Sequence, residues 1–180
     1  MRTLSVSAML MMLAVSCAAP PPQSKPLPVP QPINIPVVKA DPVKPVLVQP
    51  TGHWTDWTTA AGAWIYRRDE RGSIALYGTP GADALVTLRC DKARARLFLS
   101  RAGDVGGTMT VRTSSTSKAL AVHPTGGKPA YAASEIGVSD SILDAMAFSR
   151  GRIAFELAGV LNIAIPVWSE IGRVVEDCRA

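Results

Sequence analysis

The distribution of proline limits which part of this chain can fold into a compact domain. Eleven of the fifteen prolines lie between Ala18 and Pro50, in the runs PPP, PLPVPQP, IP, DP, KP and QP. Each proline fixes φ and removes a backbone donor, so this stretch predicts a semi-extended tether of the polyproline type and no packed core. Its upper reach is on the order of 100 Å. The folded domain is therefore expected in residues 51–180, which is long enough to bury one hydrophobic core.

The residues before the tether have the composition of an export signal. Arg2 supplies a positive charge, and the apolar run from Leu4 to Val15 is too short to span a bilayer. Ala14-Val15-Ser16-Cys17 resembles a lipobox, the site where a signal peptidase cleaves before a lipid-modified cysteine. Ordinary cleavage after Ala18 is the alternative. We predict a signal peptide, a lipidated Cys17 with its tether, and a folded domain, at residues 1–16, 17–50 and 51–180.

Short alternating runs separated by turn residues dominate the domain and indicate β structure. Strands are expected at residues 63–68, 73–77, 84–90, 94–100, 109–113, 119–123, 131–136, 152–157 and 161–165. Thr79-Pro80-Gly81 suits a type II turn, and Gly151 suits a left-handed corner between a helix and a strand.

Two helices are expected between these strands. The first covers residues 141–148, with Ser139 and Asp140 as candidate caps, and the second runs from about Pro166 to Cys178. The second helix carries a clear apolar stripe at 3.6-residue spacing, formed by Val167, Ile171, Val174, Val175 and Cys178. The fold class predicted is mainly β: an antiparallel β-sandwich or partly closed barrel with two helices, the C-terminal helix packed on the sheet.

The cysteines connect the predicted strand 84–90 to the predicted C-terminal helix. The chain has three, and lipidation of Cys17 leaves Cys90 and Cys178 as one pair for an oxidising compartment. Cys90 is in phase with Val86 and Leu88 on its strand, while Cys178 lies on the apolar stripe of the last helix. We therefore predict a disulfide between Cys90 and Cys178 that holds this helix on the sheet. Two free, buried thiols are the alternative.

Two stretches carry a resemblance to a known family. Gly52-His53-Trp54 is similar to the start of invasion-associated locus B proteins, and ILDAMAFSRGRIAFELAGVLNIAIPVWSEIGRVVEDC resembles their closing module. His53 replaces the family's Asp, and the family's extra cysteines are absent. The terminal Val-Glu-Asp-Cys-Arg also looks like that of uncharacterised proteobacterial lipoproteins. The resemblance implies a β-rich periplasmic or surface protein that is not an enzyme.

Motifs for catalysis and metal binding are missing from the sequence. His53 and His123 have no partner at metal-ligand spacing, and there is no G-x-S-x-G. Asp140 and Asp144 are better explained as a helix cap and a solvated face than as paired carboxylates. Fifteen Lys and Arg against thirteen Asp and Glu in residues 51–180 argue against a nucleic-acid partner. We predict no enzyme activity, no cofactor and no metal.

Two groups of side chains are candidates for a ligand surface. Trp54, Trp57 and Trp64 cluster at the start of the domain, and indoles can stack on sugar rings or anchor a partner. Arg89, Arg94 and Arg96, with Arg112 as a further candidate, are in outward phase on neighbouring strands and can meet phosphates or carboxylates. The alternatives are core filling for the indoles and a solvated, edge-protecting face for the arginines.

These observations together predict a non-catalytic lipoprotein of the bacterial cell envelope. Its lipid anchor would hold it on a membrane facing the periplasm, at the outer membrane in preference to the inner. Its expected role is to bind or scaffold an envelope component, with peptidoglycan or an envelope protein as the candidate partner. The alternative is a tethered inhibitor of a host or competitor enzyme.

Overall fold

The structure, a computed structural model, describes residues 48–180. They belong to a single unit. The predicted signal peptide, the lipidated Cys17 and residues 17–47 of the predicted tether lie outside the described residues and remain predictions.

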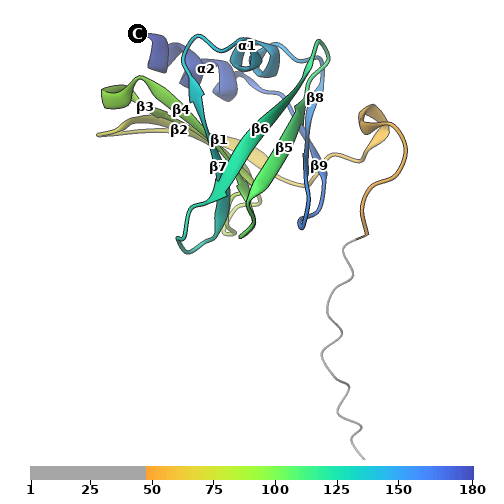
Figure 1. Ribbon diagram of the computed structural model, residues 1–180. Coiled ribbons are helices and arrows are strands. Elements are labelled where there is room, and N and C mark those ends of the chain that lie inside the picture. Colours follow the sequence, from red (N-terminus) through yellow and green to blue (C-terminus); the bar gives the residue numbers. More distant parts are fainter. Residues whose placement is uncertain (1–47) are drawn as a thin grey trace, which may run out of the picture. The chain divides into compact units, whose positions relative to one another are not determined.

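Nine antiparallel strands form one sheet in the order β1-β2-β3-β4-β7-β6-β5-β8-β9 (Figure 1). The strands are β1 Ala63–Asp69, β2 Gly72–Gly78, β3 Val86–Asp91, β4 Arg96–Ala102, β5 Gly107–Arg112, β6 Ser117–Pro124, β7 Tyr131–Gly137, β8 Arg152–Leu157 and β9 Ile163–Pro166. The remaining elements are the 3-10 turns η1 Trp54–Asp56 and η2 Lys92–Arg94 and the helices α1 Ser141–Ala147 and α2 Ser169–Arg179. The mainly β prediction is confirmed.

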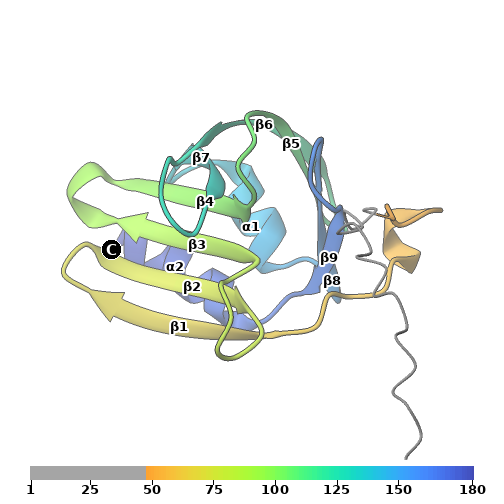
Figure 2. The same ribbon diagram turned by 90° about the horizontal axis from the view of Figure 1, so that it is seen from below.

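The sheet is strongly bent, so its two edge strands approach one another. Figure 2 shows β1 to β4 side by side, with β8 and β9 turned away from them. The indole N–H of Trp64 in β1 donates to the carbonyl of Pro166 in β9 (2.8 Å). Just before β1, Thr59 forms an isolated parallel bridge with Ala164, and Ala60 N donates to the Ala164 carbonyl (2.8 Å). These contacts join the two edges at one place, and the sheet does not close into a barrel.

Strand alternation directs one face of the bent sheet into the core. Val86, Leu88 and Cys90 of β3 are fully buried, and the residues between them are partly exposed. Helices α1 and α2 cover this face, and α2 contacts β1 to β4 (Figure 2). The apolar stripe of α2 is buried along its length, at Ile171, Val174, Val175 and Cys178. The predicted packing of the C-terminal helix on the sheet is therefore confirmed.

The start of α1 was predicted correctly from the sequence, and the start of α2 was not. Asp140 caps α1 as predicted, since its side chain accepts from Ile142 N (3.0 Å). The prediction that the last helix begins at Pro166 is wrong. Pro166 is the final residue of β9 and pairs with Arg152, so α2 begins only at Ser169.

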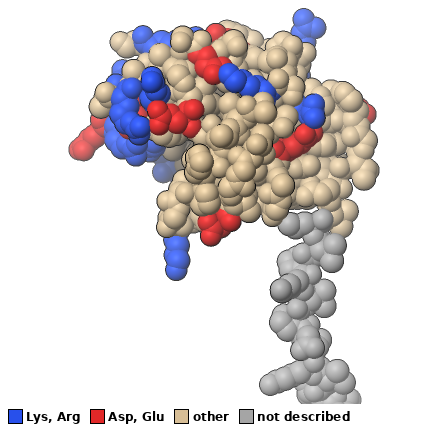
Figure 3. Space-filling model, viewed as in Figure 1, with Lys and Arg blue, Asp and Glu red and all other residues tan. Residues whose placement is uncertain are grey.

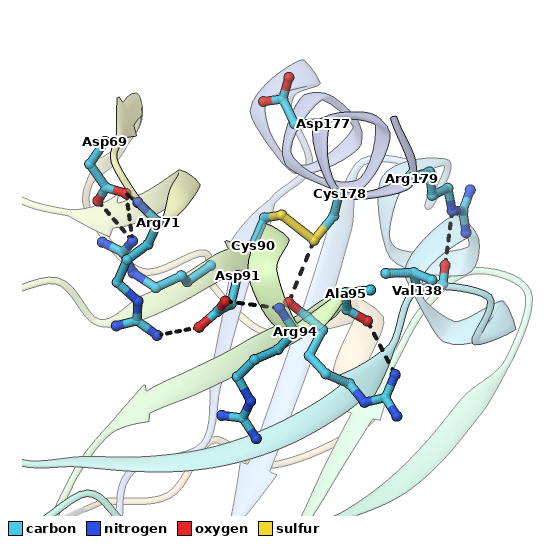
Figure 4. Close-up of a disulfide and its surroundings, with 12 residues drawn as sticks. Asp69, Arg71, Cys90, Asp91, Arg94, Ala95, Val138, Asp177, Cys178 and Arg179 are labelled. Atoms are coloured by element: carbon cyan, nitrogen blue, oxygen red, sulfur yellow. Dashed lines mark hydrogen bonds and ion pairs between the residues drawn. A yellow bond between two sulfur atoms is a disulfide. The ribbon is translucent and has the colours of Figure 1, made fainter.

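The predicted disulfide is present between β3 and α2 (Figure 4). The Cα atoms of Cys90 and Cys178 lie 5.4 Å apart, within the range that a disulfide requires. Arg179, the next residue along α2, donates from Nε to the Val138 carbonyl (2.9 Å) and pairs with Asp144 of α1 (2.7 Å). The end of α2 is thus held to the sheet by a covalent bond and to α1 by an ion pair.

A buried arginine links turns that are far apart in the sequence. Arg101 of β4 is 5% exposed, and its guanidinium donates to the carbonyls of Leu85 (3.2 Å), Ala102 (3.0 Å) and Leu161 (3.0 Å). No carboxylate among residues 48–180 pairs with it, and burial lowers the pKa of Arg101. Its role is structural, because it joins the start of β3 to the turn between β8 and β9.

Candidate functional site

The three tryptophans proposed as a ligand surface take different positions. Trp64 is 5% exposed and packs on Tyr77 in the main core, with ring centroids 5.3 Å apart. Trp57 is 7% exposed and belongs to a small second cluster on β8 and β9. Trp54 in η1 is half-buried. The structure therefore uses Trp57 and Trp64 as core filling and leaves Trp54 as the member of this set that can contact a ligand.

The arginines proposed as a second surface are all ion-paired. Arg89 pairs with Asp69 (2.7 Å), while Arg94 and Arg96 share Glu135 (2.9 and 3.1 Å). Figure 3 shows basic and acidic atoms interleaved over this end of β1 to β4. Partly exposed pairs of this kind contribute little to stability but cancel most of the local charge. The face therefore fits the solvated, edge-protecting alternative better than an anion-binding surface.

A different hollow brings together polar groups that the sequence did not associate. We call it the Trp54 groove; its volume is about 660 Å³, within the usual range for ligand sites. One wall is formed by residues 53–55 at the start of η1. A second is formed by residues 113–117, the loop between β5 and β6 together with the first residue of β6, which we call the loop 113–117. Arg112 and the corner 150–152, which leads into β8, complete it.

Hydrogen bonds between two segments hold the groove in shape. Ser149 is buried, and its hydroxyl accepts from Ser114 N (2.9 Å). In return, Arg150 N donates to the Ser114 hydroxyl (2.9 Å). Within the loop, the Thr113 hydroxyl donates to the Thr116 carbonyl (2.9 Å) and accepts from Thr116 N (3.0 Å). Loop and corner are thus fixed to one another before any ligand arrives, which lowers the entropic cost of binding.

The groove carries uncompensated positive charge. Arg112 forms two hydrogen bonds with Glu156 (2.7 and 3.0 Å), and this interaction raises the pKa of Arg112 and neutralises its charge locally. Arg152 donates only to the carbonyl of Trp57, and the Arg150 guanidinium has no partner among the described residues. No Asp or Glu is among the residues that line this groove. Arg150 and Arg152 are therefore available to an anion.

A second hollow of about 610 Å³ adjoins the first. It shares Arg150 and the loop residues 114–116 with the Trp54 groove, and adds Asp144 and Phe148. Phe148 is 80% exposed, although the next residue is buried and hydrogen-bonded. The corner after α1 thus presents an aromatic ring and a cation from a rigid backbone.

Within residues 48–180, the two histidines and the carboxylates of Asp140 and Asp144 do not pair with one another. His53 contacts Thr55 through Nδ1 (2.7 Å), and His123 is an exposed residue of β6. Lys118 pairs with Asp140 (2.6 Å), and this hydrogen bond keeps the pKa of Asp140 below its ordinary value. Asp144 is engaged by α2, as described above. The two helix carboxylates therefore act as a cap and a surface ion pair.

Comparisons of the chain with protein-family models, with curated proteins and with solved structures found no match. The resemblance to invasion-associated locus B proteins stays a prediction based on the residues quoted for it. Within residues 48–180, no helix has the length and apolar character needed to cross a membrane. The same part of the chain holds no cluster of three or more His, Cys, Asp or Glu that could bind a metal ion. Fold and groove define a bent, helix-covered β domain with one basic, hydroxyl-rich site.

Proposed function

We propose that this protein is a non-catalytic lipoprotein of the bacterial cell envelope that binds or scaffolds an envelope component. The anchor would be Cys17, with the domain facing the periplasm, at the outer membrane in preference to the inner. The observation that carries the binding role is the Trp54 groove, where an indole, a run of hydroxyls and two unpaired cations line one preformed hollow. Of the candidate partners, peptidoglycan fits this lining best, because it offers both sugar rings and carboxylates.

The anchoring part of the proposal predicts a complete change in fractionation. Cys17→Ser should move the protein out of the membrane fraction and abolish labelling by a fatty-acid probe, because no thiol remains to accept the lipid. Membrane fractionation and metabolic labelling measure this directly. A wild-type protein that stays unlabelled, with fractionation equal to that of the variant, would instead show ordinary signal-peptide cleavage.

The binding part predicts that the mature protein co-sediments with purified peptidoglycan sacculi. Trp54→Ala should weaken this binding about five- to tenfold, the range expected for loss of one aromatic contact. Trp168→Ala is a matched control, since Trp168 is 45% exposed and does not line the groove. Equal sedimentation of both variants would rule out the groove, and a wild type that does not sediment would rule out the wall as the partner.

Sedimentation of the Cys17→Ser variant, which cannot carry the proposed lipid, with anionic vesicles over a salt series tests the surface formed by Arg89, Arg94 and Arg96 separately. Because Arg89, Arg94 and Arg96 are already paired with carboxylates, we expect vesicle binding to be weak and to vanish at moderate salt. Tight binding that survives at high salt would contradict this assignment.

One observation favours the alternative, a tethered inhibitor of a host or competitor enzyme. Phe148 protrudes from a corner fixed by Ser149, and a rigid protruding side chain suits insertion into an enzyme cleft. An inhibitor of this kind needs no affinity for sacculi, so the sedimentation experiment separates the two functions.

A further inference from the structure

We infer that the Trp54 groove binds an anionic glycan, that is, a chain of sugar rings carrying carboxylate or phosphate groups. This inference rests on the proposed function and names the chemical class of its ligand. Three features of the groove carry it: the cations, the hydroxyl wall and the indole, each of which recognises a different part of such a ligand.

The two unpaired arginines of the groove favour an anionic ligand. Arg150 and Arg152 both line the groove without a carboxylate partner among the described residues, whereas Arg112 is neutralised by Glu156. A guanidinium presents a planar set of donors that matches carboxylate and phosphate oxygens. Arg150 also lines the second hollow, so it lies where a ligand longer than one ring would pass from the first hollow to the second.

The hydroxyl wall suits a sugar. All five residues of the loop 113–117 carry hydroxyl groups, and four of the five residues are exposed. The hydroxyls of Thr116 and Ser117 have no hydrogen-bond partner among residues 48–180. A hydroxyl both donates and accepts, and so do the hydroxyls of a sugar ring, so this wall matches alternating donors and acceptors along a glycan.

The indole supplies an apolar surface beside these polar groups. Trp54 packs against the small cluster that contains Trp57, which fixes its orientation while leaving it half-exposed. The His53 ring lies next to it, with centroids 6.1 Å apart and planes tilted by 35°. An indole held in this way can stack on the apolar face of a sugar ring without a large loss of side-chain entropy.

An acidic peptide fits the same groove less well. An extended peptide that binds by strand addition gains its affinity from main-chain hydrogen bonds to an open sheet edge. The loop 113–117 closes on itself, since Thr113 N donates to the Thr116 carbonyl (2.8 Å), and β5 and β6 are interior strands of the sheet. The walls therefore offer no strand edge, and the glycan is the ligand class that uses all three features.

Isothermal titration of the detergent-solubilised mature protein tests the inference with defined probes. We expect tetragalacturonate or glucose 6-phosphate to bind, and their neutral counterparts, methyl-esterified tetragalacturonate and glucose, to bind at least about tenfold more weakly. The acidic probe that exceeds its own neutral counterpart by the larger factor identifies carboxylate or phosphate as the preferred group. Arg150→Gln should weaken the binding at least about tenfold, and Arg150→Lys should restore part of it. Arg94→Gln, an exposed arginine outside the groove, is the matched control and should leave binding unchanged.

Several results would overturn the inference. They are equal binding of acidic and neutral sugars, wild-type affinity in Arg150→Gln, or tetraglutamate binding as tightly as tetragalacturonate. Failure of the wild type to bind either acidic sugar, while it still sediments with sacculi, would remove this inference and leave the proposed function standing. Failure in both experiments would remove both.

Discussion

Reduction of the disulfide between Cys90 and Cys178 should lower the free energy of unfolding by about 4 to 5 kcal/mol. The bond joins residues separated by 88 positions, so its loss restores much conformational freedom to the unfolded chain. It also frees α2, which covers β1 to β4 and contributes its whole apolar stripe to the core. Urea denaturation with and without a reductant measures the change.

Cys178→Ala provides the matched control for this experiment. The variant should lose a similar amount of stability without reductant, and adding reductant should then have no further effect. Mass spectrometry of unreduced tryptic peptides should show the Cys90 and Cys178 peptides linked in protein taken from an oxidising compartment. Free alkylation of both cysteines in that protein would contradict the cross-link.

Replacement of Arg101 by methionine should lower the free energy of unfolding by about 2 to 4 kcal/mol. Methionine fills much of the same volume but cannot donate to the carbonyls of Leu85, Ala102 and Leu161, which would stay buried without this donor. The turn between β8 and β9 would also lose its link to β4. Urea denaturation again gives the measurement.

The control for this change is Arg94→Met, at an arginine whose side chain is 56% exposed. Because Arg94 forms a partly exposed ion pair with Glu135 and lies over the Phe98 ring (5.1 Å) at the surface, its replacement should lower the free energy of unfolding by less than about 1 kcal/mol. Equal stability of the Arg101→Met variant and the wild type would contradict this prediction. It would show that the desolvation free energy of the buried guanidinium cancels the stabilisation from its three hydrogen bonds.

Local patterns in the sequence were sufficient to predict the strands, and together with the number of cysteines they predicted the cross-link. The alternation of Val86, Leu88 and Cys90 set the inward phase of β3, and the stripe through Cys178 set the buried face of α2. Turn chemistry was equally informative: Gly81 adopts φ +82°, Ala82 N donates to the Thr79 carbonyl (3.1 Å), and Gly151 adopts φ +80°. The strand phases and the turns depend on neighbouring residues only, so a single sequence is enough to predict them.

Features that depend on distant segments were harder to predict. The Trp54 groove joins η1, the loop 113–117 and the corner 150–152, and nothing local indicates that Ser114 meets Ser149. Trp54 and Arg112 were each predicted as ligand contacts but not as parts of one site, and the hydroxyl run 113–117 was a further signal in the sequence. Arg101 also had a signal, since it is in phase with Leu97 and Leu99, but the predicted strand ended one residue before it. Pro166 was misassigned because proline suits both the first turn of a helix and the end of an edge strand.

The contact between the two edges of the sheet affects how readily two copies of the domain can pair through their strands. An open strand edge is a template for aggregation, because a second chain can pair with its free N–H and C=O groups. Here the β9 edge is already engaged by Thr59 and Ala60, and the β1 edge carries the exposed charges of Arg67 and Arg68. Copies that the proposed anchor concentrates in one membrane layer would therefore meet with few open strand edges through which to pair.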